Sequence, residues 1–164
     1  MKFQFSITPS DMRRFALYHL YHTSGIITAV LIPIIGIVGF GLYGYLGEWK
    51  RAVLLLILGV GFSLVLHLNI LIRATMQAAN NQAFAAGLTY EFTEEEMIIS
   101  QGEQESKVAW NMIIKTRKTG HLLLLYTDRI HSFLIPLNRI ESLEGNANEE
   151  SVDTFVKQHV VTVK

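Results

Sequence analysis

The side chains of this sequence that could carry out chemistry are few, and their spacing does not form a catalytic or metal-binding motif. His19 and His22 lie three residues apart on a predicted helix and could share one face. Asp11 lies too far back along that helix to complete a set of metal ligands with them. Glu94–Glu96 are consecutive residues of a predicted turn, where neighbouring carboxylates point apart. The pattern therefore favours histidines of an amphipathic helix over a metal site.

Other signatures of enzymes are absent from the sequence. Asp128 and His131 are close in the chain, but no cleft is predicted around them. There is no HExxH, no GxSxG and no glycine-rich phosphate loop. The chain has no cysteine, which excludes disulfides, thiolate metal sites and cysteine nucleophiles. We therefore expect no catalytic residues, no metal and no cofactor, and we expect that the protein is not an enzyme.

One group of basic side chains flanks a predicted Thr119-Gly120 turn and is a candidate contact for a ligand or a lipid. Its members are Lys115, Arg117, Lys118 and His121. Near an anionic surface each charge could add about 1 kcal/mol of binding. However, residues 91–164 carry eight basic and twelve acidic side chains, a net charge of −4 that opposes such attraction. The alternative is an ordinary solvated hairpin tip. The acidic balance also argues against nucleic-acid binding.

Two long uncharged tracts precede this acidic half. The apolar stretches Gly25–Leu46 and Ala52–Ile72 each meet the roughly 20 residues that an α-helix needs to cross about 30 Å of hydrocarbon. The polar turn Gly47–Arg51 joins them, which predicts an antiparallel hairpin. The alternative is a pair of buried helices in a soluble bundle, but the rest of so short a chain offers little to cover both of them. We therefore predict an integral membrane protein in contact with the lipid bilayer.

The orientation of the hairpin follows from the charges at its ends. Three arginines, Arg13, Arg14 and Arg73, lie on the side of the termini, and Lys50 and Arg51 lie at the turn. The excess is small but predicts cytoplasmic termini in a multi-pass plasma (inner) membrane protein. About 22 mixed residues precede the first apolar stretch, so a cleaved signal peptide is not expected.

Small residues predict how the two spans pack, because they let helix backbones approach closely in lipid. The first span carries Gly25, Ala29, Pro33, Gly36, Gly39, Gly41 and Gly44, and the second carries Gly59 and Ser63. A transport path at a helix broken by proline is the alternative, but two spans cannot enclose one without oligomerising.

Two polar side chains lie within the second span, His67 and Asn69. Intramembrane ionisable residues are candidates for function. A neutral histidine near a helix end can instead form hydrogen bonds at the headgroup boundary, which we favour. Haem ligation with His22 is disfavoured because the two histidines are offset by roughly 13 Å along the helix axis.

The flanking segments predict a second, β-rich body. Alternation in Met1–Ile7 indicates a strand that needs partners in the C-terminal half. Thr8 as N-cap, Pro9 as the first helical residue and Asp11 at the N3 position then begin an interfacial helix. Further strands are predicted at Leu88–Thr93, Met97–Gln101, Glu105–Trp110, Ile113–Lys118, His121–Tyr126 and His131–Ile135. They suggest a meandering antiparallel sheet, closed by an amphipathic helix over Glu149–Val160, as in a PH-like barrel.

The predicted organisation is an α+β membrane protein in four parts: residues 1–24 as the strand and interfacial helix, 25–72 as the transmembrane hairpin, 73–87 as a helical connector ending at Gly87, and 88–164 as the PH-like domain. The expected core of that domain is apolar and aromatic. It comprises Tyr90, Phe92, Ile98, Val108, Trp110, Ile113, Leu123, Leu125, Phe133, Ile135 and Phe155.

Three segments together resemble the YcxB-like family of small bacterial membrane proteins. They are Phe3–Asp11 leading to Phe15 and Tyr18, the tryptophan-centred Lys107–Ile113, and Phe133–Arg139 with its Ile-Pro and following basic residue. The resemblance implies two transmembrane helices and a C-terminal PH-like domain, and it implies no particular activity. The stretch after the second span is rich in Lys and Arg in that family, whereas Ala74–Gly87 has none. This departure argues against clamping of anionic lipid by that stretch.

Two classes of function follow. We expect a membrane-tethered binding or regulatory module whose cytoplasmic PH-like domain meets a ligand or a protein partner. The alternative is a small structural or accessory subunit that self-associates through its glycine-lined helices. The ligand, the partner and the stoichiometry are left open by the residues.

Overall fold

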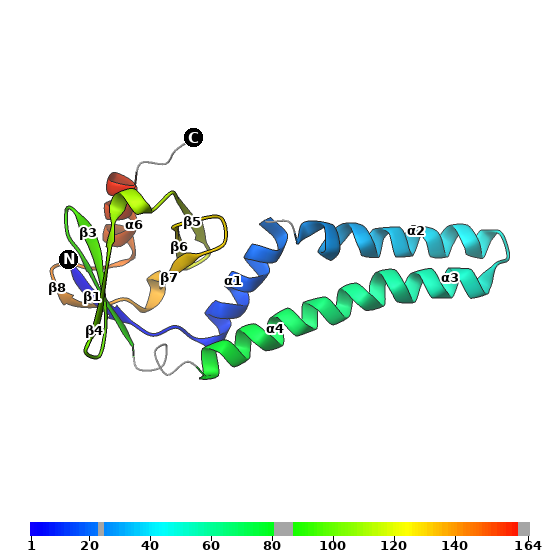
Figure 1. Ribbon diagram of the computed structural model, residues 1–164, viewed down its shortest axis with the longest axis horizontal. Helices are drawn as coiled ribbons and strands as arrows, with labels where there is room; N and C mark the ends of the chain where they lie inside the picture. Colours follow the sequence, from blue (N-terminus) through cyan, green and yellow to red (C-terminus); the bar gives the residue numbers. More distant parts are fainter. Residues whose placement is uncertain (23–24, 81–86, 161–164) are drawn as a thin grey trace. The chain divides into compact units, whose positions relative to one another are not determined.

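The computed structural model describes residues 1–22, 25–80 and 87–160, and the chain divides into two compact units (Figure 1). Met12–Gln77 form a helical unit, and Met1–Asp11 together with Ala78–Lys164 form a unit of strands and one helix. The predicted α+β composition, with two long apolar helices followed by antiparallel strands, is confirmed.

The helical unit contains two long helices joined by a tight turn. Its segments are α1 (Pro9–His22), η1 (Ile27–Leu31), α2 (Ile32–Tyr45), α3 (Trp49–Leu56), η2 (Ile57–Gly61) and α4 (Phe62–Asn80). Gly47, with φ of 75°, makes the turn. The helices Ile27–Tyr45 and Trp49–Asn80 are long and apolar enough to cross a membrane, by length and composition. The predicted extension of the second helix to Ala86 falls partly outside the described residues, because 81–86 are not among them.

The two long helices contact each other through glycine, as the small residues predict. A Cβ placed on Gly36 would lie 2.8 Å from the Cα of Gly59, and one on Gly59 would lie 2.6 Å from the Cα of Gly36. The Ser63 hydroxyl donates to the Thr28 carbonyl across the same contact, at 3.2 Å. In contrast, a Cβ on Gly41 would meet nothing within 4 Å. The hairpin thus uses only some of its glycines for its own packing.

In the other unit, the described residues form eight strands in two antiparallel sheets. They are β1 (Lys2–Phe5), β2 (Leu88–Phe92), β3 (Glu96–Gln101), β4 (Gln104–Ala109), β5 (Lys115–Thr119), β6 (Leu122–Tyr126), β7 (Ser132–Pro136) and β8 (Glu141–Glu144). The order is β4-β3-β2-β1-β8 in one sheet and β5-β6-β7 in the other. β1 pairs with β2 on one side and β8 on the other. The predicted pairing of the N-terminal strand with the C-terminal half is confirmed.

The single meandering sheet that the turns suggested is wrong, because the chain changes sheet after β4. Trp110 begins the 3₁₀ turn η3 (Trp110–Met112), and its ring nitrogen donates to the Thr93 carbonyl at 2.9 Å. This buried anchor holds the turn, and β5 then starts a new ladder. β8 had no counterpart among the predicted strands, because its four residues, Glu141–Glu144, are all exposed and show no apolar alternation.

The predicted C-terminal helix is present as α6 (Glu149–His159). Asn148 caps it, accepting from the Ser151 backbone N–H at 2.8 Å while the Ser151 hydroxyl accepts from the Asn148 N–H at 2.8 Å. Phe155 packs against Phe92 and Trp110, with ring centroids 5.6 and 5.8 Å apart. α6 therefore adds aromatic contacts to the side of β2 that faces the core.

Most of the predicted core is buried, including Leu123 and Leu125 of β6, and the other three residues of that strand are buried as well. Ile98 is the main error: it is half-buried, while Met97 is fully buried. Met97 pairs with Phe92 and Ile98 pairs with Glu91, so alternation puts Met97 on the inner face. Phe133 and Phe155 are also only half-buried, at the start of β7 and on α6.

Candidate functional site

The basic residues predicted around the Thr119-Gly120 turn do not form one surface. Lys118 makes an ion pair with Glu149, at 3.0 Å. The Lys115 ammonium lies 5.9 Å from the centre of the Tyr126 ring, while Arg117 is exposed and forms no ion pair with any described residue. Because β5 alternates its side chains, Lys115 and Arg117 share one face and Lys118 lies on the other.

His121, the fourth member of the predicted group, is directed to a different partner. Its Nε2 lies 3.0 Å from Oδ1 of Asp11, a residue 110 positions earlier in the chain. The structure therefore separates the predicted group into a paired lysine, two exposed cations and a histidine that belongs to a buried cluster.

Asp11 is the centre of that cluster and is fully buried. The backbone N–H and the hydroxyl of Thr8 both donate to its Oδ2, at 2.9 and 2.7 Å. Arg139, which precedes β8 in the 3₁₀ turn η4 (Leu137–Arg139), forms an ion pair with the same oxygen. The bond from the Thr8 N–H is one half of the predicted capping box; the Asp11 N–H donates to the Thr8 carbonyl instead of the Thr8 hydroxyl. The contacts with His121 and Arg139 were not predicted.

The environment of Asp11 keeps its carboxyl group ionised. Burial by itself would raise the pKa of Asp11. The hydrogen bonds from Thr8 and His121, together with the charge of Arg139, outweigh burial and hold the pKa below its ordinary value. A buried carboxylate with this many partners joins the beginning of α1 to both sheets. We call these four residues, Thr8, Asp11, His121 and Arg139, the Asp11 cluster.

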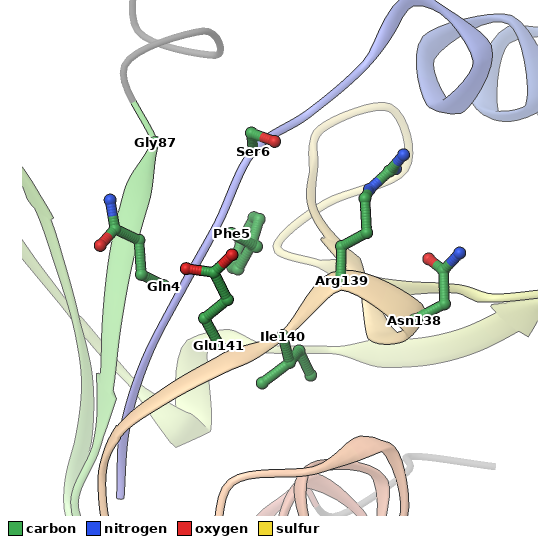
Figure 2. A pocket seen from close by; sticks show the side chains of 8 residues that line it. All are labelled: Gln4, Phe5, Ser6, Gly87, Asn138, Arg139, Ile140 and Glu141. Carbon is green, nitrogen blue, oxygen red and sulfur yellow. The ribbon is translucent and has the colours of Figure 1, made fainter.

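A polar groove lies next to the Asp11 cluster, where β1 and β8 separate. Its volume is ≈ 520 Å³, within the range of small-molecule sites. Gln4, Phe5, Ser6, Gly87, Asn138, Arg139, Ile140 and Glu141 line it (Figure 2). Figure 2 shows Arg139 and Glu141 on one side of their segment and Ile140 on the other. Because the Arg139 guanidinium is paired with Asp11, the groove presents an anion, two amides and a hydroxyl to a ligand.

One glycine lines the groove, and its backbone conformation accounts for it. Gly87 has φ of +90°, which favours glycine, and a Cβ there would lie 2.5 Å from the Gln4 side-chain nitrogen. A larger residue would therefore strain the backbone and displace the end of the Gln4 side chain. The expected end of a helix at Gly87 concerns residues 81–86, which lie outside the described part of the chain.

Other ionisable residues are arranged in small local pairs. Nε2 of His159 lies 3.0 Å from Glu94, and its ring stacks on Phe155 at 4.0 Å between centroids. The hydrogen bond to Glu94 and the one to the Phe155 carbonyl raise the pKa of His159. Asp128 contacts His131 at 2.6 Å in the exposed loop between β6 and β7.

The polar residues of the helical unit have local partners as well. His67 Nδ1 lies 2.8 Å from the Ser63 carbonyl, and its Nε2 lies 2.9 Å from the Tyr21 hydroxyl. His22 contacts the Tyr18 carbonyl, and Asn69 accepts from Arg73. Both histidines considered for haem thus use ring nitrogens for hydrogen bonds. No group of three or more metal-ligating side chains occurs within residues 1–22, 25–80 and 87–160.

Comparison with known proteins gives one result. The model of the YcxB-like protein family matches residues 92–145, which run from the end of β2 to just beyond β8, and this confirms the resemblance predicted from the sequence. No curated protein and no solved structure matches the chain.

Proposed function

Since residues 92–145 carry a YcxB-like segment, we propose that this protein is a membrane-anchored binding module. The helices Ile27–Tyr45 and Trp49–Asn80 anchor it in the plasma membrane, and the β-rich unit is a PH-like domain that holds the ligand. Two antiparallel sheets followed by a helix at the C-terminal end of the fold support the PH-like description.

The observation that carries the membrane anchor is the exposure of the two apolar helices. Only 6% of the most apolar window of the first and 11% of that of the second are buried. A core helix of a soluble protein would be covered by other elements. Each large apolar side chain left in water costs about 1.5–3 kcal/mol relative to burial, so a lipid environment accounts for surfaces that the fold leaves uncovered.

Lipid contact is tested at Leu58, an exposed residue of η2. Because the chain has no cysteine, Leu58→Cys can be labelled at one position with a fluorophore. After reconstitution into vesicles, lipids that carry a quencher in the acyl chain should quench this label. An unquenched label would contradict the anchor. For orientation, a reporter fused after Lys164 should be active only in the cytoplasm, and activity confined to the outside would contradict cytoplasmic termini.

The binding role is assigned to the groove of Figure 2. Its lining combines Glu141 with the side chains of Gln4, Ser6 and Asn138, which suits a polar ligand or a peptide that both donates and accepts hydrogen bonds. The structural-subunit alternative loses part of its basis, because Gly36 and Gly59 already contact each other within one chain.

Photo-crosslinking in intact membranes separates the two functions. A photoreactive residue at Asn138 should give a discrete adduct, whereas the same residue at Glu103, in the exposed turn between β3 and β4, should not. Adducts from Gly41 in the first helix, with none from Asn138, would contradict the binding module and favour the structural subunit.

A further inference from the structure

Large apolar side chains are exposed together at one end of the three-stranded sheet. Met112 is 56% exposed, Ile114 44% and Ile130 62%. Ile114 immediately precedes β5, and its N–H donates to the Tyr126 carbonyl at the end of β6, at 2.8 Å. The loop that carries Ile130 begins at Thr127, the residue after Tyr126. Its two ends are joined by a hydrogen bond from the Thr127 N–H to the His131 carbonyl, at 3.2 Å. The ladder therefore places Ile114 beside the base of this loop.

The loop is held in one shape by its own hydrogen bonds. Oδ1 of Asp128 accepts from the backbone N–H groups of Ile130 and His131, at 2.7 and 2.8 Å. Its Oδ2 lies 2.6 Å from Nδ1 of His131. Both carboxylate oxygens of Asp128 thus bind partners within the loop. These bonds preorganise the turn, in which the Ile130 side chain is exposed to solvent. A contact made by such a turn loses little conformational entropy.

Two cations adjoin the apolar residues along the chain. Lys115 follows Ile114 directly, on the opposite face of the β5 ladder, and Arg129 precedes Ile130. Arg129 is exposed and has no ion pair with any residue of the described ranges. Asp128 is the single acid of the loop between β6 and β7, and its charge lies against its own backbone donors. This end of the sheet is therefore basic and apolar, although residues 91–164 as a whole are acidic.

We propose that Met112, Ile114, Lys115, Arg129 and Ile130, together called the loop surface, form a second membrane contact that docks into the headgroup region of an anionic bilayer. Apolar side chains flanked by Lys and Arg are the combination that binds at a membrane interface. The proposal rests on the membrane anchor proposed above. Because the anchor keeps the domain near the bilayer at high effective concentration, a contact of modest intrinsic affinity is enough.

A second exposed apolar residue supplies a matched control. Leu143 in β8 is 50% exposed, like the residues of the loop surface, but it lies in a strand with Glu141 and Glu144 and no basic residue. Anionic lipid repels these carboxylates. If exposure alone decided lipid contact, Leu143 and Ile130 would lie in the same environment. The proposal instead predicts lipid contact for Ile130 and water for Leu143.

Single-cysteine labelling of the full-length protein tests this difference. Ile130→Cys, Met112→Cys, Leu143→Cys and Leu58→Cys are each labelled with an environment-sensitive fluorophore in vesicles of phosphatidylethanolamine and phosphatidylglycerol, and quencher-bearing lipids are added. We expect quenching at positions 130, 112 and 58, and a solvent-exposed signal at 143. Agreement between positions 130 and 112 guards against a local effect of one substitution.

Charge reversal supplies the second arm. In the Ile130→Cys protein, Lys115→Glu with Arg129→Glu should lower the docking equilibrium by at least about 30-fold, because each cation lost is worth about 1 kcal/mol and each new carboxylate adds repulsion. Raising salt to about 1 M, where the Debye length falls to about 3 Å, should weaken docking in the same direction.

Each remaining outcome overturns a defined statement. If positions 130 and 112 report water while 58 is quenched, the loop surface is not a lipid contact and the anchor stands. If they are shielded in native membranes but not in pure-lipid vesicles, the loop surface binds a protein and the lipid proposal is wrong. If 58 itself is unquenched, the anchor and the loop-surface proposal both fail.

Discussion

Asp11 caps a helix, as its local sequence predicts, and it also contacts residues that are distant in the chain. Its position three residues after Thr8 predicts a helix-capping carboxylate, and the structure has that contact. The same side chain also meets His121 and Arg139, more than 100 residues away, in a fully buried environment. A buried carboxylate with a capping bond, an ion pair and a histidine contact is a structural joint of the β-rich unit.

Removing this carboxylate should destabilise the β-rich unit strongly. We expect Asp11→Ala to lower its free energy of unfolding by about 3 kcal/mol, because Arg139 would lose the partner of a largely buried ion pair. Denaturant unfolding in detergent, followed by Trp110 emission in a Trp49→Phe background, measures this. As a control, Glu105→Gln removes an exposed ion pair with Lys107 on β4 and should cost less than about 0.5 kcal/mol. Equal losses of unfolding free energy in the two variants would contradict a structural role for Asp11 beyond that of a surface ion pair.

His159 should make the stability of the β-rich unit depend on pH. Its hydrogen bond to Glu94 raises its pKa above the ordinary value of 6.5. A group with a raised pKa in the folded state contributes stability that is present below pH 6.5 and is lost as pH rises through the folded-state pKa. Melting temperature should therefore fall more between pH 6 and pH 8 in the natural protein than in Glu94→Gln. The effect should be small and sensitive to salt, since Glu94 is largely exposed.

At the scale of elements, the helical hairpin depends on where each glycine lies. Sequence spacing predicted small residues at the contact but could not say which of seven in the first span would face the second. In the structure Gly36 meets Gly59 and Gly39 meets the Leu55 side chain, whereas Gly41 is open. The rotation of each helix about its own axis determines which glycines face the other helix. That rotation depends on packing and cannot be obtained from residue spacing.

Alanine substitutions distinguish these two positions. Gly36→Ala would place a Cβ 2.8 Å from the Gly59 backbone, so the helices must separate and we expect a lower thermal stability of the hairpin. Gly41→Ala meets nothing within 4 Å and should leave it unchanged. Circular dichroism at 222 nm during heating in detergent measures both. A large loss from Gly41→Ala would show that its surface is covered by another copy of the chain.

The β3 strand illustrates a different limit. Its apolar run Met97–Ile99 has no alternation, so either face could be chosen as the inner one. The short turn after β2 pairs Phe92 with Met97, and residues directly opposite each other in an antiparallel ladder share a face. Since Phe92 was already expected in the core, that pairing was the available signal for Met97.

At the scale of the whole molecule, the β-rich unit contains residues from both ends of the chain. β1 lies between β2 and β8, and its residues Phe3 and Phe5 are buried. Residues 88–164 alone would lack this interior strand, so β2 and β8 would each lose the partner that β1 provides. Studies of the domain therefore need the N-terminal segment.

Deletion of residues 2–7 should unfold the β-rich unit and spare the hairpin. Loss of two buried phenylalanines costs about 3–5 kcal/mol each, which is comparable to the stability of a small domain. We expect Trp110 emission to shift to the solvent-exposed wavelength in the Trp49→Phe background, while the protein stays in membranes after alkaline extraction. A native Trp110 spectrum would show that β1 is dispensable.

The sequence alone determined the features that depend on local pattern. Runs of uncharged residues predicted both long helices, alternation and turns predicted seven of the eight strands, and the amphipathic stripe predicted α6. The tertiary structure decided the features that depend on residues distant in the chain: the division into two sheets, the burial of Asp11 beside His121 and Arg139, and the exposed loop surface. Periodicity records which face of an element is apolar, whereas only packing determines which elements those faces meet.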